Sequence, residues 1–120
     1  MYKVPCMVRR RRLVTEPTYF ILAALLDGPL HGYGIIKHAK ELSGGRVRLA
    51  VGTLYGALDR LSADGLITLD REEVVDGRPR RYYRITDDGT LVVTQEAERM
   101  RQAAQVVIRR GALRPGTAPA

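Results

Sequence analysis

The segment from Val51 to Leu66 restricts the fold of this chain more than any other part of the sequence. Large apolar side chains recur in it with the spacing of one face of an α-helix. They are Val51, Leu54, Tyr55, Leu58 and Leu61. The opposite face carries mainly small and polar residues, namely Gly52, Thr53, Gly56, Ala57, Asp59, Arg60 and Ala63. Because small side chains let a backbone approach a partner closely, the segment predicts a helix, ended by Gly65, that packs on one side and fits a groove on the other.

Two β-strand patterns follow this helix, at residues 67–74 and 80–85. The loop between them contains Asp76, Gly77 and Pro79, which are typical turn residues. Acidic side chains lie on the first strand and in the loop, whereas arginines lie at the tip and on the second strand. A helix followed by a hairpin with a basic tip is the pattern of a winged helix-turn-helix, in which the helix enters the major groove of DNA and the hairpin follows the phosphates.

Further helices are expected on both sides of this unit. Thr15, Glu16 and Pro17 predict a helix start, and that helix should end near Leu26. A second helix is expected from about His31 to Leu42, and the short segment 46–49 is a candidate third strand beside the hairpin. The predicted fold is mostly α with a small β-hairpin, an α+β class: a winged helix-turn-helix domain plus a C-terminal dimerisation helix.

The C-terminal helix is predicted over residues 86–110, with Thr86 as its N-cap. Its narrow apolar stripe resembles a coiled-coil seam and is expected to form a dimer interface. The stripe consists of Val93, Ala97, Met100, Ala104 and Val107. The alternative is that the stripe folds back onto the first helix of the same chain.

Length and charge fit one small basic domain of 120 residues, with a formal net charge of +7 and a pI near 10.1. Much of the excess charge lies in Lys3 and Arg9–Arg12, so the total charge alone does not establish a nucleic-acid partner. The expected organisation is a disordered basic arm (1–14), the winged domain (15–85), the dimerisation helix (86–110) and a disordered tail (111–120).

Enzymatic, metal-binding and membrane functions are not expected. The single Cys6 favours a cytoplasmic protein, and no Cys/His cluster has the spacing of a zinc site. His31 and His38 have no partner motif for catalysis, so neither a catalytic residue nor a cofactor is predicted. No segment approaches membrane-spanning length.

Several short motifs, taken together in their order and spacing, resemble the PadR family of bacterial transcriptional regulators. They are His31-Gly-Tyr33, Gly52-Thr-Leu-Tyr55 with Leu58 and Leu61, Gly65-Leu-Ile67, Gly77-Arg-Pro-Arg-Arg-Tyr-Tyr83, and Ile85-Thr86 with Gly89. The resemblance covers residues 13–95 and is to the short subfamily with a single C-terminal helix. It implies a dimeric winged helix-turn-helix, in most cases a repressor, with the recognition helix at 51–64, the wing tip at 75–80 and the dimerisation helix at 86–110. The chain departs from the family pattern at Gly56, where proline is common, and at Gly34, where an acid is common.

The candidate DNA-binding residues fall into three groups. Tyr19, Tyr33 and Tyr55 are expected to donate hydroxyl hydrogen bonds to phosphates, although core packing is an alternative for all three, more so for Tyr19 and Tyr33. Thr53 and Arg60 are candidates for base contacts, although Arg60 has Asp59 and Asp64 as alternative ion-pair partners. The wing arginines expected at phosphates are Arg78, Arg80 and Arg81. Because neighbours on a strand point to opposite faces, Arg80 and Arg81 do not both face the DNA.

The sequence therefore predicts a ligand-responsive repressor that binds a palindromic operator in double-stranded DNA as a homodimer. A small apolar or aromatic effector between the C-terminal helices is the expected signal, and its identity does not follow from the sequence. The alternative is a winged-helix module that binds another protein and not DNA. The bare face around Thr53 favours DNA, because a protein-binding helix would carry large apolar anchors there.

Overall fold

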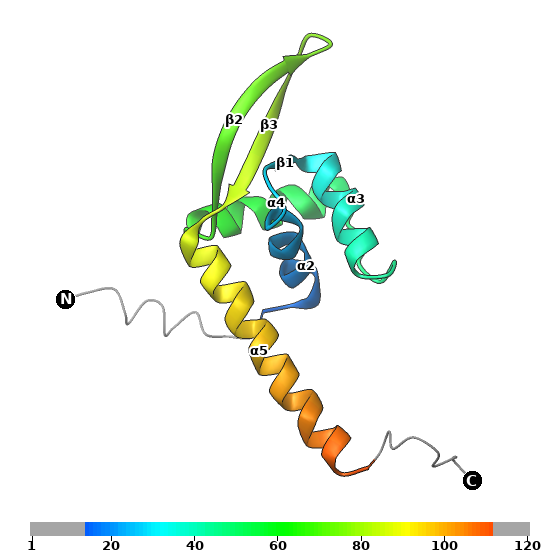
Figure 1. Cartoon of the computed structure of the whole chain (residues 1–120). Coiled ribbons are helices and arrows are strands. Elements are labelled where there is room, and N and C mark those ends of the chain that lie inside the picture. Colours follow the sequence, from blue (N-terminus) through cyan, green and yellow to red (C-terminus); the bar gives the residue numbers. More distant parts are fainter. Residues whose placement is uncertain (1–13, 112–120) are drawn as a thin grey trace, which may run out of the picture.

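The computed structural model describes residues 14–111, in which four helices and three strands follow one another along the chain (Figure 1). They are α2 (Glu16–Leu25), β1 (Leu30–His31), α3 (Gly32–Leu42), α4 (Val51–Ala63), β2 (Ile67–Val75), β3 (Arg78–Ile85) and α5 (Asp87–Arg109). The predicted α+β class is confirmed, and the predicted helices end within a few residues of the observed bounds. The predicted arm and tail lie outside the described residues, except for Val14 and Gly111.

The helices begin where the sequence supplies caps. The hydroxyl of Thr15 accepts a hydrogen bond from the Thr18 backbone N–H at 3.3 Å, and Pro17 occupies the first turn of α2. Thr86 caps α5 in the same way, because its hydroxyl accepts from the Gly89 N–H at 3.0 Å. Both caps satisfy backbone donors that a helix start would otherwise leave without partners.

One apolar core joins α2, α3, α4, the base of the hairpin and the first turns of α5. Its members are Ile21, Leu22, Leu25, Ile35, Leu54, Ala57, Leu58, Leu61, Ile67, Tyr83 and Val93. Burial of these side chains is what fixes the relative positions of the helices. It also separates α4 into a buried and an exposed face.

The buried face of α4 is rotated from the one that the sequence predicted. Val51 and Tyr55 were expected in the apolar stripe, but they are 45% and 46% exposed. Ala57 was expected on the bare face, but only 5% of its surface is exposed. Ala57 faces the core because its methyl side chain lets α4 pack closely against the other helices. With α4 in this orientation, Val51 and Tyr55 lie at the edge of the core.

The three strands form an antiparallel sheet in the order β1-β3-β2. The third strand is Leu30–His31, which pairs with Tyr83 and Tyr82 of β3. The prediction that residues 46–49 supply this strand is wrong, because they form the loop before α4. The hairpin itself is confirmed: Asp76 and Gly77 form its tip with φ of 52° and 78°, the left-handed values that a type I′ turn requires.

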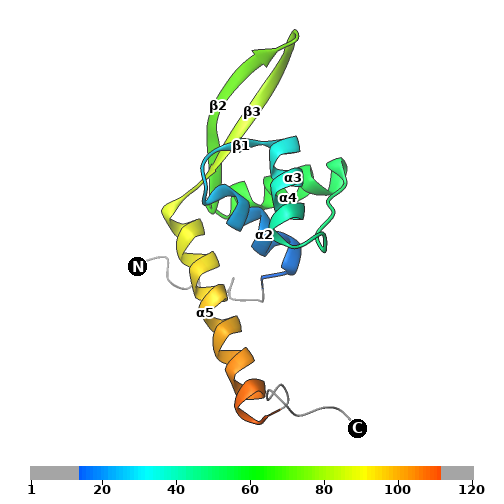
Figure 2. The ribbon, with the colours of Figure 1, turned by 45° about the vertical axis from the view of Figure 1, so that its right-hand side comes forward.

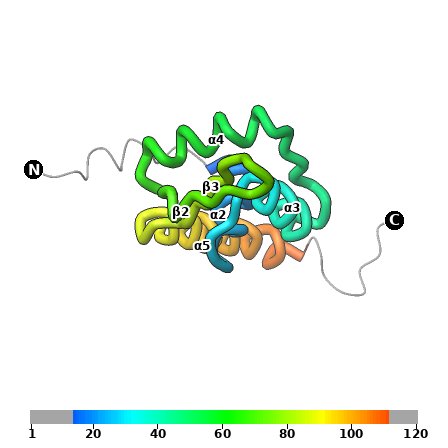
Figure 3. The backbone as a smooth tube through the Cα atoms, turned by 90° about the horizontal axis from the view of Figure 1, so that it is seen from above, coloured from blue at the N-terminus to red at the C-terminus, as the bar shows by residue number. Residues whose placement is uncertain are grey.

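The elements extend in two directions from the helical body. The β2–β3 hairpin rises on one side of the body, and the C-terminal half of α5 projects on the other (Figure 2). Seen from above, α4 and α5 lie on opposite sides of the molecule, with α2 and the hairpin between them (Figure 3). Among the helices of residues 14–111, none combines the length and the apolar composition that crossing a membrane would need.

A histidine links the α2–β1 turn to α3. His38 Nε2 lies 2.8 Å from Asp27 Oδ2, and His38 Nδ1 lies 3.5 Å from Glu41 Oε1. The hydrogen bond to Asp27, supported by Glu41, raises the pKa of His38 above its ordinary value. The imidazolium form therefore holds this turn against α3.

This contact predicts a pH-dependent contribution to stability. Because the pKa of His38 is raised in the folded state, the stabilisation is present below the pKa of the unfolded chain and is lost as pH rises through the folded-state pKa. We expect His38→Asn to lower the Tm clearly at about pH 5.5 and hardly at about pH 8.5. Thermal unfolding followed by circular dichroism at both pH values tests this. An equal loss at both would show that the histidine contributes by packing alone.

Candidate nucleic-acid interface

The exposed face of α4 gives direct access to its backbone. A Cβ placed at Gly52 would meet no atom of residues 14–111 within 4 Å, and one at Gly56 would meet only the Nη1 atom of Arg60, at 3.7 Å. Thr53 and Arg60 are exposed on this helix. The two predicted base-contact residues are therefore exposed beside Gly52, and the Arg60 side chain reaches back along α4 to Gly56. Such a surface can approach the floor of a groove.

Tyr55 connects α4 to the start of α3. A Cβ at Gly32 would lie 2.7 Å from the Tyr55 hydroxyl oxygen and 3.2 Å from its ring carbon. The ring of Tyr55 therefore crosses the first residue of α3, and a larger side chain at position 32 would displace it. The hydroxyl lies at the junction of the two helices while the side chain remains 46% exposed. Tyr55 can thus position α4 and donate to a ligand at once.

The other two predicted tyrosines differ in environment. Tyr33 is 70% exposed on the first turn of α3, where its hydroxyl is available to a partner. Tyr19 packs against the core and meets Phe20 edge-to-face, with ring centroids 5.1 Å apart. Packing against the core was the alternative for Tyr19, and this environment favours it.

The wing arginines differ in whether they form an ion pair within the hairpin. Arg81 Nε donates to Glu72 Oε2 at 3.0 Å, across the two strands, and this bond raises the pKa of Arg81. Within residues 14–111, Arg78 and Arg80 form no ion pair. The expectation that Arg80 and Arg81 differ in role agrees with this arrangement. Arg81 is held by a carboxylate, whereas Arg78 is exposed at the tip. Arg80 lies opposite Glu73 in the strand register and helps to lower the pKa of Glu73 without forming an ion pair with it.

The Tyr82 ring of the sheet is contacted by two side chains. The guanidinium carbon of Arg71 lies 4.0 Å from the centroid of the Tyr82 ring, and the His31 ring meets Tyr82 at 5.3 Å. Arg71 also donates to Glu73 at 2.9 Å, which lowers the pKa of Glu73. Burial, with help from the nearby charge of Arg80, lowers the pKa of His31. His31 therefore packs on the sheet against Tyr82.

The predicted seam of α5 is partly used within one chain. Val93 is only 3% exposed and belongs to the core, so it has almost no surface left for a second copy. The placement of Val93 in a dimer interface is corrected accordingly. Ala97 is half-buried, whereas Ala104 is exposed and Met100 and Val107 are 38% and 51% exposed. The alternative of packing on the first helix thus holds for the start of α5 and not for its end.

The sequence reasoning missed the basic side chains beside the N-terminal end of α4. Lys37 and Lys40 are exposed on α3, and Arg46 and Arg48 are exposed on the loop that leads to α4. The alternation of Arg46 and Arg48 around Val47 is typical of a strand, but the segment is a loop. Their position directly before α4 was the signal that could have identified them.

The order and geometry of these elements define the class of protein. Two helices, α3 and α4, joined by a loop and followed by a hairpin with a basic tip, form a winged helix-turn-helix (Figure 1). In the part of the chain that the structure describes, no group of three or more His, Cys, Asp or Glu side chains is placed to hold a metal ion.

Comparison with known proteins identifies the family within this class. Residues 21–95 match the Transcriptional regulator PadR-like family, and the chain belongs to it. A transcriptional regulator of Mycobacterium tuberculosis, Rv3488, is 39% identical over 88 residues, which are 73% of this chain and 78% of that protein. The family is one of transcriptional regulators and not of enzymes, as the sequence predicted.

Two solved structures show the same fold. A transcriptional regulator from Clostridium thermocellum superposes with a TM-score of 0.64 at 28% identity, over 76% of this chain and 88% of that one. PadR from Bacillus subtilis, solved in complex with operator DNA, superposes with a TM-score of 0.57 at 25% identity, over 85% of this chain and 53% of that one.

Proposed function

We propose that this regulator represses transcription in the cytoplasm by binding a palindromic operator as a homodimer. Two copies of α4 would enter successive major grooves, about 34–36 Å apart, and the wings would lie along the flanking phosphates. The observation that carries the proposal is the exposed face of α4, where Thr53 and Arg60 are exposed beside the accessible backbone at Gly52. The operator complex of the Bacillus subtilis relative supports it.

The end of α5 supports the dimer. Its C-terminal half projects from the body (Figure 1) and exposes large apolar side chains. These are Met100, Val106, Val107 and Ile108. Exposed apolar side chains of this number on one projecting helix favour burial against a second chain. The seam through Ala97, Met100, Ala104 and Val107 is the proposed contact.

Hydrogen bonds connect the start of α5 to the residues that follow α4, and this connection offers a route for a signal between the two helices. The Thr86 N–H donates to the Leu66 carbonyl at 3.0 Å, and the Thr86 hydroxyl donates to the Gly65 carbonyl at 2.7 Å. The start of α5 is therefore attached to the residues that end α4. A small apolar or aromatic effector that changed the angle between two α5 helices would change the separation of the two α4 helices, and so the affinity for the operator.

A mobility shift over a salt series tests the DNA-binding part of the proposal. The probe is a duplex with the region upstream of the chain's own gene, and a mixed-sequence duplex of equal length is the control. We expect preferential binding to the upstream region and a steep fall of affinity with salt, because phosphate contacts release counterions. Absence of binding to both duplexes would contradict the proposal and favour a protein partner.

The wing gives a matched pair of variants for the phosphate contacts. We expect Arg80→Gln to reduce the slope of log affinity against log salt by about 0.9, the value of one phosphate contact. Arg81→Gln should change that slope much less, because the charge of Arg81 is already compensated by Glu72. Fluorescence anisotropy with a labelled duplex at several salt concentrations measures both slopes. Equal reductions would show that only net charge matters at the wing.

A further inference from the structure

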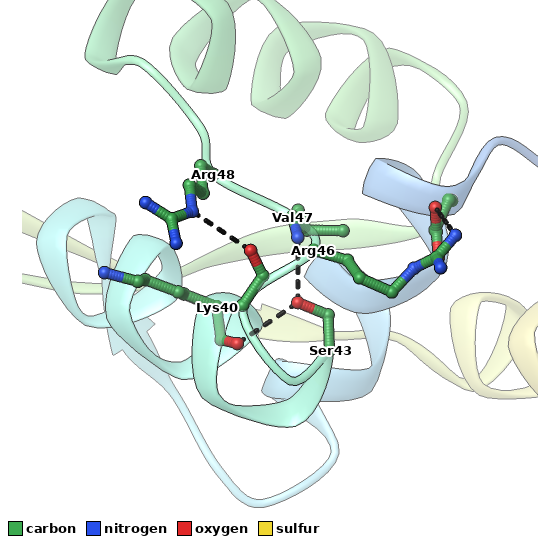
Figure 4. Close-up of polar contacts among 7 residues, drawn as sticks. Lys40, Ser43, Arg46, Val47 and Arg48 are labelled. Carbon is green, nitrogen blue, oxygen red and sulfur yellow. Dashed lines mark hydrogen bonds and ion pairs between the residues drawn. The ribbon is translucent and has the colours of Figure 1, made fainter.

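The loop between α3 and α4 is fixed by its own hydrogen bonds and is not a loose connection. Val47 is 4% exposed, and its N–H donates to the Ser43 hydroxyl oxygen at 2.9 Å. The same hydroxyl donates to the Lys40 carbonyl at 3.1 Å, and Ser43 is itself buried. Figure 4 shows these bonds at the centre of the loop. The side chains on either side of Val47 therefore leave from defined positions.

Arg46 is turned towards the start of α2. Its guanidinium donates to both carboxylate oxygens of Glu16, at 2.8 and 3.1 Å, and these bonds lower the pKa of Glu16. The pair joins the loop to a helix 30 residues earlier in the chain. Because both donors point at one carboxylate, the charge of Arg46 is compensated within the protein.

Arg48 is turned the other way, to the side of Lys40 (Figure 4). Its Nε donates to the Gly45 carbonyl at 3.0 Å, which orients the guanidinium and leaves its two terminal nitrogens available. Within residues 14–111, neither Arg48 nor Lys40 forms an ion pair. The nearest acid on α3, Glu41, is directed at His38. Arg48 and Lys40 thus lie on the same side of the loop in Figure 4, and Arg46 lies on the other.

The position of this pair matters because α4 begins three residues after Arg48, at Val51. The wing follows the opposite, C-terminal end of α4 (Figure 1). Lys37, one turn before Lys40, is also exposed on α3. Arg48 therefore stands directly before the helix that carries Thr53 and Arg60, and the wing, with its own arginines at the tip, follows that helix in the chain. A DNA duplex carries phosphates on both sides of the groove that such a helix would enter.

We propose that Arg48 and Lys40 contact DNA phosphates at the N-terminal end of α4, and that Arg46 has no part in this contact. The inference rests on the proposed DNA binding and extends the interface beyond the wing and α4. Arg48 would act by its planar guanidinium, which can bind two phosphate oxygens, and Lys40 as a point charge beside it.

The two loop arginines provide the test, because Arg46→Gln and Arg48→Gln remove the same charge within the same loop. Affinity for a fluorescein-labelled duplex with the upstream region of the gene is measured by anisotropy at several salt concentrations. We expect Arg48→Gln to lower the slope of log affinity against log salt by about 0.9, and Arg46→Gln to leave it unchanged. Lys40→Gln should lower it as well, and Arg48→Lys should keep most of it, because the charge remains. Circular dichroism confirms that each variant is folded.

The outcomes separate this inference from the proposed function. If the wild-type protein binds the duplex and Arg48→Gln leaves the slope unchanged, the contact at Arg48 is wrong and DNA binding stands. Equal reductions by Arg46→Gln and Arg48→Gln would also overturn the contact, since net charge alone would then explain both. If the wild-type protein binds no duplex, the proposed function fails and this inference fails with it.

Discussion

Replacing Gly89 with alanine is expected to cost about 3 kcal/mol of unfolding free energy, at the upper end of the range for overpacked sites. A Cβ at this position would overlap the carbonyl oxygen of Leu66 and would lie 2.7 Å from Cγ1 of Ile85. The carbonyl belongs to the backbone and accepts a hydrogen bond from the Thr86 N–H at 3.0 Å, so it cannot move without breaking the joint between α4 and α5.

Thermal unfolding followed by circular dichroism measures this effect, and a fall in Tm of more than about 10 °C is expected. Gly56→Ala is the matched control, because a Cβ there meets only the end of the Arg60 side chain at 3.7 Å. A glycine in a helix costs up to about 1 kcal/mol relative to alanine, so this control should raise the Tm. A Gly89→Ala protein as stable as the wild type would show that α5 does not need its close approach to Leu66.

Placing a carboxylate in the proposed seam by Val107→Glu is expected to dissociate the dimer and to reduce operator affinity by about 10²–10⁴. Val107 is 51% exposed on the part of α5 that projects from the body, so the single chain should fold normally. In a symmetric dimer the substitution buries two charges without partners, which is costly. Each released monomer would then bind one half of the operator alone, without the higher affinity that simultaneous binding of both halves gives to the dimer.

Gln95→Glu adds the same charge on the opposite side of α5 and serves as the control. Sedimentation velocity gives the mass of each variant, and a mobility shift with the upstream duplex gives its affinity. We expect the Gln95→Glu protein to remain dimeric and to bind as the wild type does. A Val107→Glu protein that is still dimeric would place the contact elsewhere on the chain.

Much of the candidate site could be predicted because it depends on neighbours in the sequence. The helix from Val51 follows from the spacing of its leucines, and the hairpin tip follows from Asp76 and Gly77, which accept the left-handed conformation that the turn needs. The cap at Thr86 is likewise local. The prediction failed where several patterns were compatible with the same residues. Val47 has the apolar character of a strand residue, but it is buried in a loop that Ser43 fixes.

The charges show most clearly what the sequence left open. Arg46, Arg48, Arg80 and Arg81 have the same chemistry and similar surroundings in the sequence. In the fold, Arg46 meets Glu16 on another helix and Arg81 meets Glu72 across the hairpin, whereas Arg48 and Arg80 remain without an ion pair within residues 14–111.

The sequence by itself determined the helices, the hairpin and its turn, because helix periodicity and turn preference depend on residues only a few positions apart. Only the tertiary structure decided that Leu30–His31 completes the sheet, that Val93 is buried within the chain, and which arginines form ion pairs. These outcomes depend on which segments, far apart in the sequence, the packed core brings into contact. Local sequence patterns do not specify such contacts.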